Sequence, residues 1–232
     1  MAQLQMQWPP FTDKLKVLAV VLFTLWFASV MVAPLGAFVD QYMLVSQAAV
    51  FQGQVWTIFT YSLWHADFIH LLFNVGVIWL FGGEISARWS NLEWWRFNGL
   101  CVLGGGLAVV LAQLIFGSQP TLGYSAAVMG IIAAFAWQNW DRTIYLFFFP
   151  MKGKTLLIVV IVFDAFRFVF GTFGGAEPIS IAAHLGGLAT GLLIVTGWWR
   201  PSRLKRRWTR YRQRRKFKVI RKEAEKDYKY LN

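Results

Sequence analysis

Seven polar or ionisable side chains lie within or beside long apolar stretches of this 232-residue sequence. They are His65, His70, Asn74, Ser125, Asp164, Arg167 and His184. Such groups are costly in an apolar environment, and an ionisable residue there marks a functional site by default. The set contains all three histidines of the chain, the side chains best suited to moving protons near neutral pH. The chemistry of the protein is therefore expected among these residues.

A serine and a histidine of this set have the types that acyl transfer requires. A serine hydroxyl becomes a nucleophile only beside a base, and His184 is the base expected at the right depth from another helix. Ser125 opens an apolar stretch, where free backbone N–H groups and the positive end of a helix favour an oxyanion. His70 and Asn74 are four residues apart, so they share one helix face and can add side-chain donors. Structural alternatives remain: Ser125 as a helix N-cap, and the other three as hydrogen-bonding residues that tie helices and loops together.

Membrane-spanning helices must position these residues. Apolar residues make up 57% of the sequence and charged residues only 15%, which argues against an ordinary soluble domain. Six apolar stretches are candidate helical crossings: about 15–39, 68–83, 97–116, 124–139, 155–173 and 179–199. The sequence therefore predicts an all-α polytopic bundle of six transmembrane helices. The second and fourth stretches are short, so five crossings is the alternative.

The positive charges predict the orientation of this bundle. Every second connection between the apolar stretches contains Lys or Arg, and the connections between those contain neither. Both ends of the chain contain them. This alternation predicts that both termini are cytoplasmic. The even-numbered helices then enter from the outer side, with His184 about 7–8 Å deep at 1.5 Å per residue. Ser125 and His70 lie near the same ends, so one site open to the outer side is expected.

A basic tail carries the whole net charge of +12. Residues 200–232 hold 15 of the 23 Lys and Arg and 3 of the 11 Asp and Glu, which leaves residues 1–199 neutral. We expect a membrane domain over 1–199 and a basic cytoplasmic tail over 200–232. Trp208, Tyr211 and Phe217 lie among the cations, which favours contact with anionic lipid headgroups. Topology fixing is the alternative, and nucleic acid is not an expected partner, because no motif for it is present.

The segment 40–67 is too long for a tight turn. It is rich in aromatic residues, namely Phe51, Trp56, Phe59, Tyr61 and Trp64, with polar residues between them. We expect a structured, partly embedded outer loop between the first and second helices. The first apolar stretch is longer than a signal-peptide core and has no basic start, so we expect it to be retained as a helix.

Three sequence motifs together resemble those of the rhomboid intramembrane serine proteases. The run WHADFIHLLFN resembles their second-helix signature with its H-x-x-x-N, GYSAAVMG resembles their nucleophile motif G-x-S-G, and AHLGGLATG resembles their base helix. The resemblance covers residues of about 15–199. It implies a six-helix rhomboid-like fold, no cofactor, and cleavage of peptide bonds in or near the transmembrane helices of protein substrates.

The resemblance also implies roles for particular residues. Ser125 would be the nucleophile and His184 the general base of a dyad without a carboxylate. His70, Asn74 and the Ser125 backbone N–H would stabilise the oxyanion. His65 matches a further family histidine, for which we expect loop anchoring.

The sequence departs from the family pattern at several positions. Gly123 precedes the serine as expected, but the glycine that usually follows the nucleophile is Ala126. Met129 replaces a tyrosine that some bacterial members place against the base. Ser86 replaces a usual acidic residue, with Glu84 two positions earlier. Both Ala126 and Met129 are possible supporting residues of the site.

Other functions are weaker candidates. A catalytically silent rhomboid-like protein that binds client transmembrane helices is the main alternative, and Ala126 supports it. A transporter is less favoured, because the polar groups cluster at one depth. A metal site from the three histidines is not expected. Asp164 and Arg167 are three residues apart and are expected to neutralise each other. The N-terminus lacks a transit-like composition, which favours a bacterial cytoplasmic membrane.

Overall fold

Helices dominate the part of the chain that the computed structural model describes, namely residues 8–146, 149–171 and 178–197. Six long helices correspond to the six apolar stretches: α1 (Asp13–Met31), α5 (Phe68–Arg88), α6 (Asn91–Phe116), α7 (Ser125–Gln138), α8 (Gly153–Gly171) and α9 (Pro178–Thr196). Of the described helices, α1, α5, α6 and α9 are long and apolar enough to cross a membrane. The chain is a polytopic helical membrane protein, as the sequence predicts. The predicted boundary at 199 and the tail over 200–232 lie outside the described residues.

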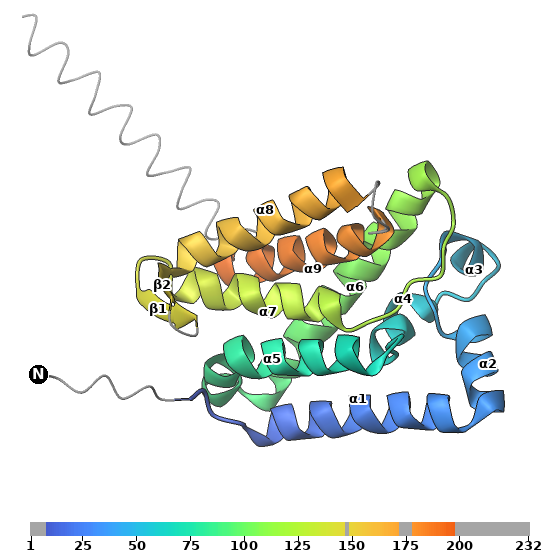
Figure 1. Ribbon diagram of the computed structural model, residues 1–232, viewed down its shortest axis with the longest axis horizontal. Helices are drawn as coiled ribbons and strands as arrows, with labels where there is room; N and C mark the ends of the chain where they lie inside the picture. Colours follow the sequence, from blue (N-terminus) through green and yellow to red (C-terminus); the bar gives the residue numbers. More distant parts are fainter. Residues whose placement is uncertain (1–7, 147–148, 172–177, 198–232) are drawn as a thin grey trace, which may run out of the picture. The chain divides into compact units, whose positions relative to one another are not determined.

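The first predicted crossing, 15–39, is wrong in its extent. Helix α1 ends at Met31, and a separate helix, α2 (Ala33–Tyr42), begins two residues later. Val32 between them has extended backbone angles (φ −114°, ψ 92°), and Pro34 follows in the first turn of α2. Proline has no N–H to continue a helix but suits the first turn of a new one, so the apolar run is divided here. Figure 1 shows α2 turning away from the axis of α1.

The predicted outer loop is structured. It contains α3 (Gln47–Phe51), α4 (Thr57–Thr60) and the 3₁₀-helix η1 (Tyr61–Leu63). The loop is fixed to α6, because the buried Tyr61 hydroxyl donates to the carbonyl of Val102 at 2.9 Å. A β-carbon built at Gly106 of α6 would lie 2.5 Å from the carbonyl oxygen of Ile58, so the loop backbone packs directly on this glycine. The loop is thus part of the packed body.

Helix α7 is the central element of the bundle. Figure 1 shows α7 between α5 on one side and α8 and α9 on the other, and α7 contacts α5, α6 and α8. Ten of its 14 residues are buried, and five of those ten are alanines. A helix that is apolar and buried all round needs small side chains wherever its neighbours come close. The shortness of the fourth apolar stretch therefore reflects an internal helix.

Glycines bring the backbones of α6, α7 and α9 close together. A β-carbon at Gly191 of α9 would lie 2.7 Å from the Cα atom of Gly130 in α7. A β-carbon at Gly186 would lie 2.5 Å from the carbonyl oxygen of Gly104 in α6. The close approach of the fourth and sixth apolar stretches that the small residues predict is therefore present.

A β-hairpin joins α7 to α8 and was not predicted from the sequence. Strands β1 (Thr143–Leu146) and β2 (Phe149–Lys152) are antiparallel, with Thr143 opposite Lys152. Lys154 at the start of α8 forms an ion pair with Asp141 at 2.8 Å. Two four-residue strands give too short an alternation to be distinguished from a connecting loop.

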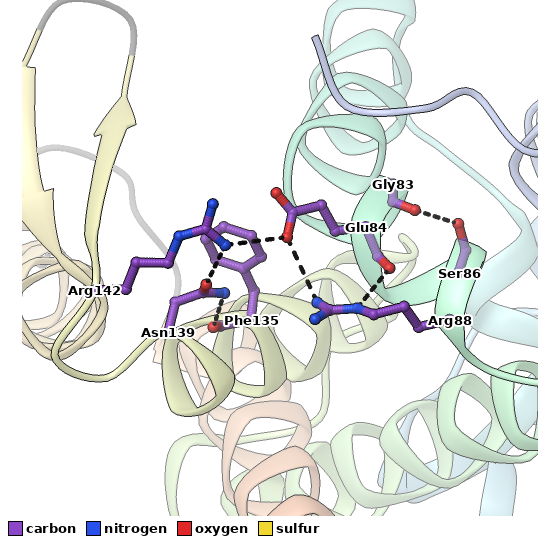
Figure 2. Close-up of polar contacts among 7 residues, drawn as sticks. All are labelled: Gly83, Glu84, Ser86, Arg88, Phe135, Asn139 and Arg142. Carbon is purple, nitrogen blue, oxygen red and sulfur yellow. Dashed lines mark hydrogen bonds and ion pairs between the residues drawn. The ribbon is translucent and has the colours of Figure 1, made fainter. Parts of the chain in front are cut away.

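A cluster of charged residues lies at the C-terminal end of α5 (Figure 2). The Glu84 carboxylate is 3.5 Å from Arg88 on the same helix and 3.9 Å from Arg142 beyond α7. The Ser86 hydroxyl donates to the carbonyl of Gly83 at 2.9 Å and also contacts Thr12. The cluster lies more than three helical turns along α5 from His70.

Candidate functional site

Ser125 is the first residue of α7 and follows a bend at Gly123. Gly123 has a φ of +120°, which residues with a β-carbon rarely adopt, and its N–H donates to the Tyr61 carbonyl at 3.0 Å. The N-cap of α7 is Tyr124, so Ser125 lies one residue inside the helix. The Ser125 backbone N–H is thus among the first N–H groups of the helix, which have no acceptor within it. This N–H and the helix dipole are both available to an anion at this position.

His65 and Tyr124 fix the segment before Ser125. The Tyr124 N–H donates to Nε2 of His65 at 3.4 Å, and the Tyr124 hydroxyl lies 3.1 Å from Oδ1 of Asn98 on α6. His65 is only 6% exposed. Burial, helped by the nearby His70 and opposed by Asp67, lowers the pKa of His65 to about 3. His65 is therefore neutral at physiological pH, and its Nε2 atom is able to accept the hydrogen bond from Tyr124.

His184 lies on α9 beside the first turn of α7. A β-carbon at Gly187, three residues after His184, would overlap the carbonyl oxygen of Ala126 and lie 2.8 Å from its Cα atom. Because Ser125 directly precedes Ala126, this close backbone approach holds the serine and the histidine at the same end of the two helices. The His184 side chain is 13% exposed, and Ser125 is half-buried, so both remain within reach of water.

The carboxylate of Asp164 lies against the Nδ1 edge of the His184 ring. Both carboxylate oxygens of Asp164 on α8 are 3.1 Å from Nδ1 of His184. Arg167 is also paired with Asp164, but its Nη1 atom is farther away, at 3.7 Å. The sequence predicts that Asp164 pairs with Arg167, and this pair is present, but Asp164 also contacts His184. The resemblance implies a dyad without a carboxylate, and the structure differs at this point.

His70 lies on α5 next to the bend before Ser125, on the same helix as Asn74. A β-carbon at Gly123 would be 2.8 Å from Cε1 of His70, so the imidazole lies directly against this glycine. The His70 ring also packs edge-on against His65, with the ring centroids 5.1 Å apart. Asn74 is buried one turn further along α5 and donates to the His70 carbonyl at 3.1 Å. His70 is thus beside the nucleophile segment, whereas one amide proton of Asn74 is already used within its own helix.

Ala126 and Met129, which depart from the family pattern near the nucleophile, have different surroundings. The methyl group of Ala126 faces Gly105 of α6, where a β-carbon would overlap it. The absence of a side chain at Gly105 therefore makes room for the extra methyl group. Met129 is half-buried one turn after Ser125 and packs against the main apolar core.

Sequence reasoning missed several residues that position the site. Tyr61, Asn98 and Gly105 gave no local signal, because their roles depend on contacts with segments far away in the sequence. Asp164 was recognised as unusual, but its contact with His184 was not. Within the described ranges, no three His, Cys, Asp or Glu side chains are grouped so that they could hold a metal ion.

The fold defines the class of the chain: a polytopic helical membrane protein whose histidines and first-turn serine gather at one end of a buried central helix. Residues 52–201, about two thirds of the chain, match the Rhomboid domain. The chain therefore belongs to the rhomboid family. Its membership was expected from the three motifs and is confirmed.

Curated relatives are similar over the same region. The chain is 25% identical over 150 residues to the rhomboid protease GluP of Bacillus subtilis (strain 168), which covers 65% of this chain and 27% of that protein. It is 27% identical over 154 residues to the rhomboid protease GlpG of Enterobacter sp. (strain 638), which covers 62% of this chain and 49% of that protein. The matched region thus spans half or less of the length of these relatives.

Proposed function

We propose that the chain is an intramembrane serine endopeptidase that cleaves peptide bonds in or near transmembrane segments of membrane-protein substrates. The observation that carries this proposal is the close backbone approach of Ala126 and Gly187. It holds Ser125, at the start of α7, and His184, one turn before Gly187, at the same end of two closely packed helices. The two relatives reported above are named rhomboid proteases, which supports the same activity.

The proposed reaction is acyl transfer to a serine. Ser125 Oγ attacks the substrate carbonyl carbon while its proton passes to the imidazole of His184, and the carbonyl π electrons move to the oxygen. His70, Asn74 and the Ser125 N–H stabilise this oxyanion. The oxyanion then re-forms the carbonyl, the C–N bond breaks, and His184 gives its proton to the leaving amine, which leaves an acyl-enzyme at Ser125. Water, activated by the same imidazole, hydrolyses the acyl-enzyme and restores the serine.

The length of α7 supports a site below the membrane surface. Its 14 residues make a helix about 21 Å long, which is shorter than the roughly 30 Å hydrocarbon core. Its C-terminal end is followed by Asp141 and Arg142, which suit the aqueous interface. With this end at one interface, Ser125 lies about 9 Å inside the other. Substrate peptide bonds within a membrane segment are accessible at that depth.

The charge distribution supports an orientation with the site facing outward. Lys14 donates to backbone carbonyls at Ser86 and Trp89, and Arg88 and Arg142 share Glu84, so these cations gather at the opposite end of α5 from His70. By the positive-inside rule this end is cytoplasmic. We propose a bacterial cytoplasmic membrane location, with both termini inside and the tail over 200–232 on anionic headgroups.

The structure weakens the case for a catalytically silent rhomboid-like protein that binds client transmembrane helices. Ala126 is the sequence feature that suggests inactivity, but Gly105 provides the space for its methyl group. The segment Gly123–Tyr124 that leads into Ser125 is also held by specific hydrogen bonds. The motif departure is thus compensated by a neighbouring helix.

The test is cleavage of a reporter with a helix-destabilised membrane segment by the purified full chain in proteoliposomes. Ser125→Ala and His184→Ala should each abolish cleavage, a loss of at least about 10³-fold. Ser29→Ala is the matched control, because within the described residues the Ser29 hydroxyl donates to the local carbonyl of Trp26. Ser125 should also be labelled by a fluorophosphonate probe. Full activity in either dyad variant, or an unlabelled wild-type serine, would contradict the proposal.

A further inference from the structure

Asp164 is a buried carboxylate with an unusual position. It lies in the middle of α8, and its side chain is only 2% exposed. An isolated charge is expensive there, so a buried carboxylate must be paired and hydrogen-bonded. Its partners therefore indicate why the residue is present.

His184 is the hydrogen-bond partner of Asp164, and Arg167 is its ionic partner. Both Asp164 oxygens are 3.1 Å from Nδ1 of His184, which is a hydrogen-bond distance. The 3.7 Å separation from Arg167 Nη1 is an ion pair but too long for a hydrogen bond. The Arg167 side chain is 32% exposed, so solvent weakens its interaction more than that of the buried imidazole.

This contact determines which nitrogen of His184 carries the proton. A carboxylate can only accept hydrogen bonds, so Nδ1 must donate. In the neutral ring Nε2 is then unprotonated, with its lone pair on the edge away from Asp164. A general base needs a free lone pair of this kind, and a ring held in one tautomer and orientation offers it permanently.

We propose that Asp164 is a positioning residue for His184 and holds the general base of the Ser125–His184 dyad in one tautomer and orientation; this inference rests on the proposed protease function. When Ser125 Oγ bonds to the substrate carbonyl carbon, its proton moves to Nε2 of His184 and the ring becomes an imidazolium. Asp164 stabilises that cation through Nδ1–H and keeps its own negative charge throughout. When Nε2 returns the proton to the leaving amine, the original tautomer is restored.

The charged groups near His184 predict how each change alters the pH dependence of activity. Asp164 and Arg167 approach from α8, and His70 of α5 lies against Gly123, in the segment that leads into Ser125. Removing Asp164 removes the group that favours the imidazolium, so the acid limb of activity should move to lower pH. Arg167 and His184 both pair with Asp164, so among the described residues removing Arg167 leaves the carboxylate to His184 alone. The acid limb of activity should then move to higher pH.

A purely structural tie between α8 and α9 gives a different expectation. In that case the loss of Asp164 lowers the unfolding temperature but leaves the pH dependence of the remaining activity unchanged. Glu84→Gln is the matched control, because Glu84 is also a carboxylate paired with arginines but lies at the far end of α5 (Figure 2). It should lower thermal stability without moving the acid limb.

The experiment measures kcat and KM separately from pH 5 to 9 for the full chain in proteoliposomes, with thermal unfolding and the rate of fluorophosphonate labelling of Ser125. Asp164→Asn should lower kcat at least about tenfold with KM within threefold, and move the acid limb to lower pH. Arg167→Gln should retain more activity and move the limb upward. If Asp164→Asn fails to fold, the upward shift in Arg167→Gln still tests the proposal.

The outcomes separate this inference from the protease function. If the wild-type chain cleaves and is labelled, but Asp164→Asn and Arg167→Gln have the pH profile of Glu84→Gln, the positioning role of Asp164 is refuted and the Ser125–His184 dyad stands. If the wild-type chain neither cleaves nor is labelled at Ser125, the proposed function and the positioning role both fail.

Discussion

Replacing Gly187 by alanine tests the close approach that holds the two ends of the site together. The new β-carbon would overlap the carbonyl oxygen of Ala126 and lie 2.8 Å from the α-carbon of that residue. Carbon atoms rest at about 3.5 Å or more, so the α-carbon alone requires a retreat of about 0.7 Å, and the oxygen requires more. Both obstacles are backbone atoms that cannot rotate away. Helix α9 must therefore move by about 1 Å from α7.

This displacement should be visible in activity before it is visible in folding. A shift of about 1 Å between reacting groups can cost about 10²-fold in rate. Overpacking of this size costs about 1–3 kcal/mol of stability, which many folded proteins survive. We therefore expect kcat/KM for Gly187→Ala to fall about 100-fold in the reporter assay, while the chain still inserts and shows a cooperative thermal transition.

Gly99→Ala is the matched control for this variant. Gly99 is also a helical glycine, on α6, but a β-carbon there would meet no atom of the described ranges within 4 Å. Alanine favours helix over glycine by about 1 kcal/mol, so this control should be neutral or slightly stabilising. A Gly187→Ala enzyme with kcat/KM within threefold of the Gly99→Ala enzyme would refute the reasoning that the approach of α9 to α7 positions the site.

Two further predictions concern the supports of the nucleophile segment. Gly105→Ala should reduce cleavage by at least about tenfold, because its methyl group would overlap that of Ala126, and adding Ala126→Gly should recover part of the loss in a double-mutant cycle. The lowered pKa of His65 means that the unfolded chain binds the proton more readily, so stability is complete above about pH 6.5 and falls as the pH drops toward 3. Thermal unfolding from pH 7 to 4 should show this fall, and His65→Gln should make it shallower by up to about 1.4 kcal/mol per pH unit; an equal slope in both proteins would contradict the titration of His65.

Much of the fold was predictable because a membrane imposes a simple pattern. Long apolar stretches separated by polar connections predict the approximate helices, and α5, α6 and α9 lie close to the predicted ranges. The pattern fails where a second influence acts within an apolar stretch. The break at Val32 depends on Pro34 and on the loop that follows, and the hairpin over 143–152 is too short to give a periodic signal.

The site was only partly predictable, for a related reason. Ser125, His184 and His70 stand out in the sequence because polar side chains are rare in apolar helices. Their supports do not stand out, since Gly105 is one of 20 glycines and Tyr61 is one of many aromatic residues in its loop. Their importance comes from what lies opposite them, namely Ala126 and the Val102 carbonyl.

By itself, the sequence determined the class of the protein, the approximate helices, the neutral body with its basic tail, and the residue types available for acyl transfer. Those properties follow from composition and local spacing, which do not depend on how the chain packs. Only the tertiary structure decided that His184 turns its Nδ1 atom to Asp164, although the sequence spacing within α8 had paired that carboxylate with Arg167 alone. The two residues are 20 positions apart on different helices, and a contact of that kind exists only once the helices have packed.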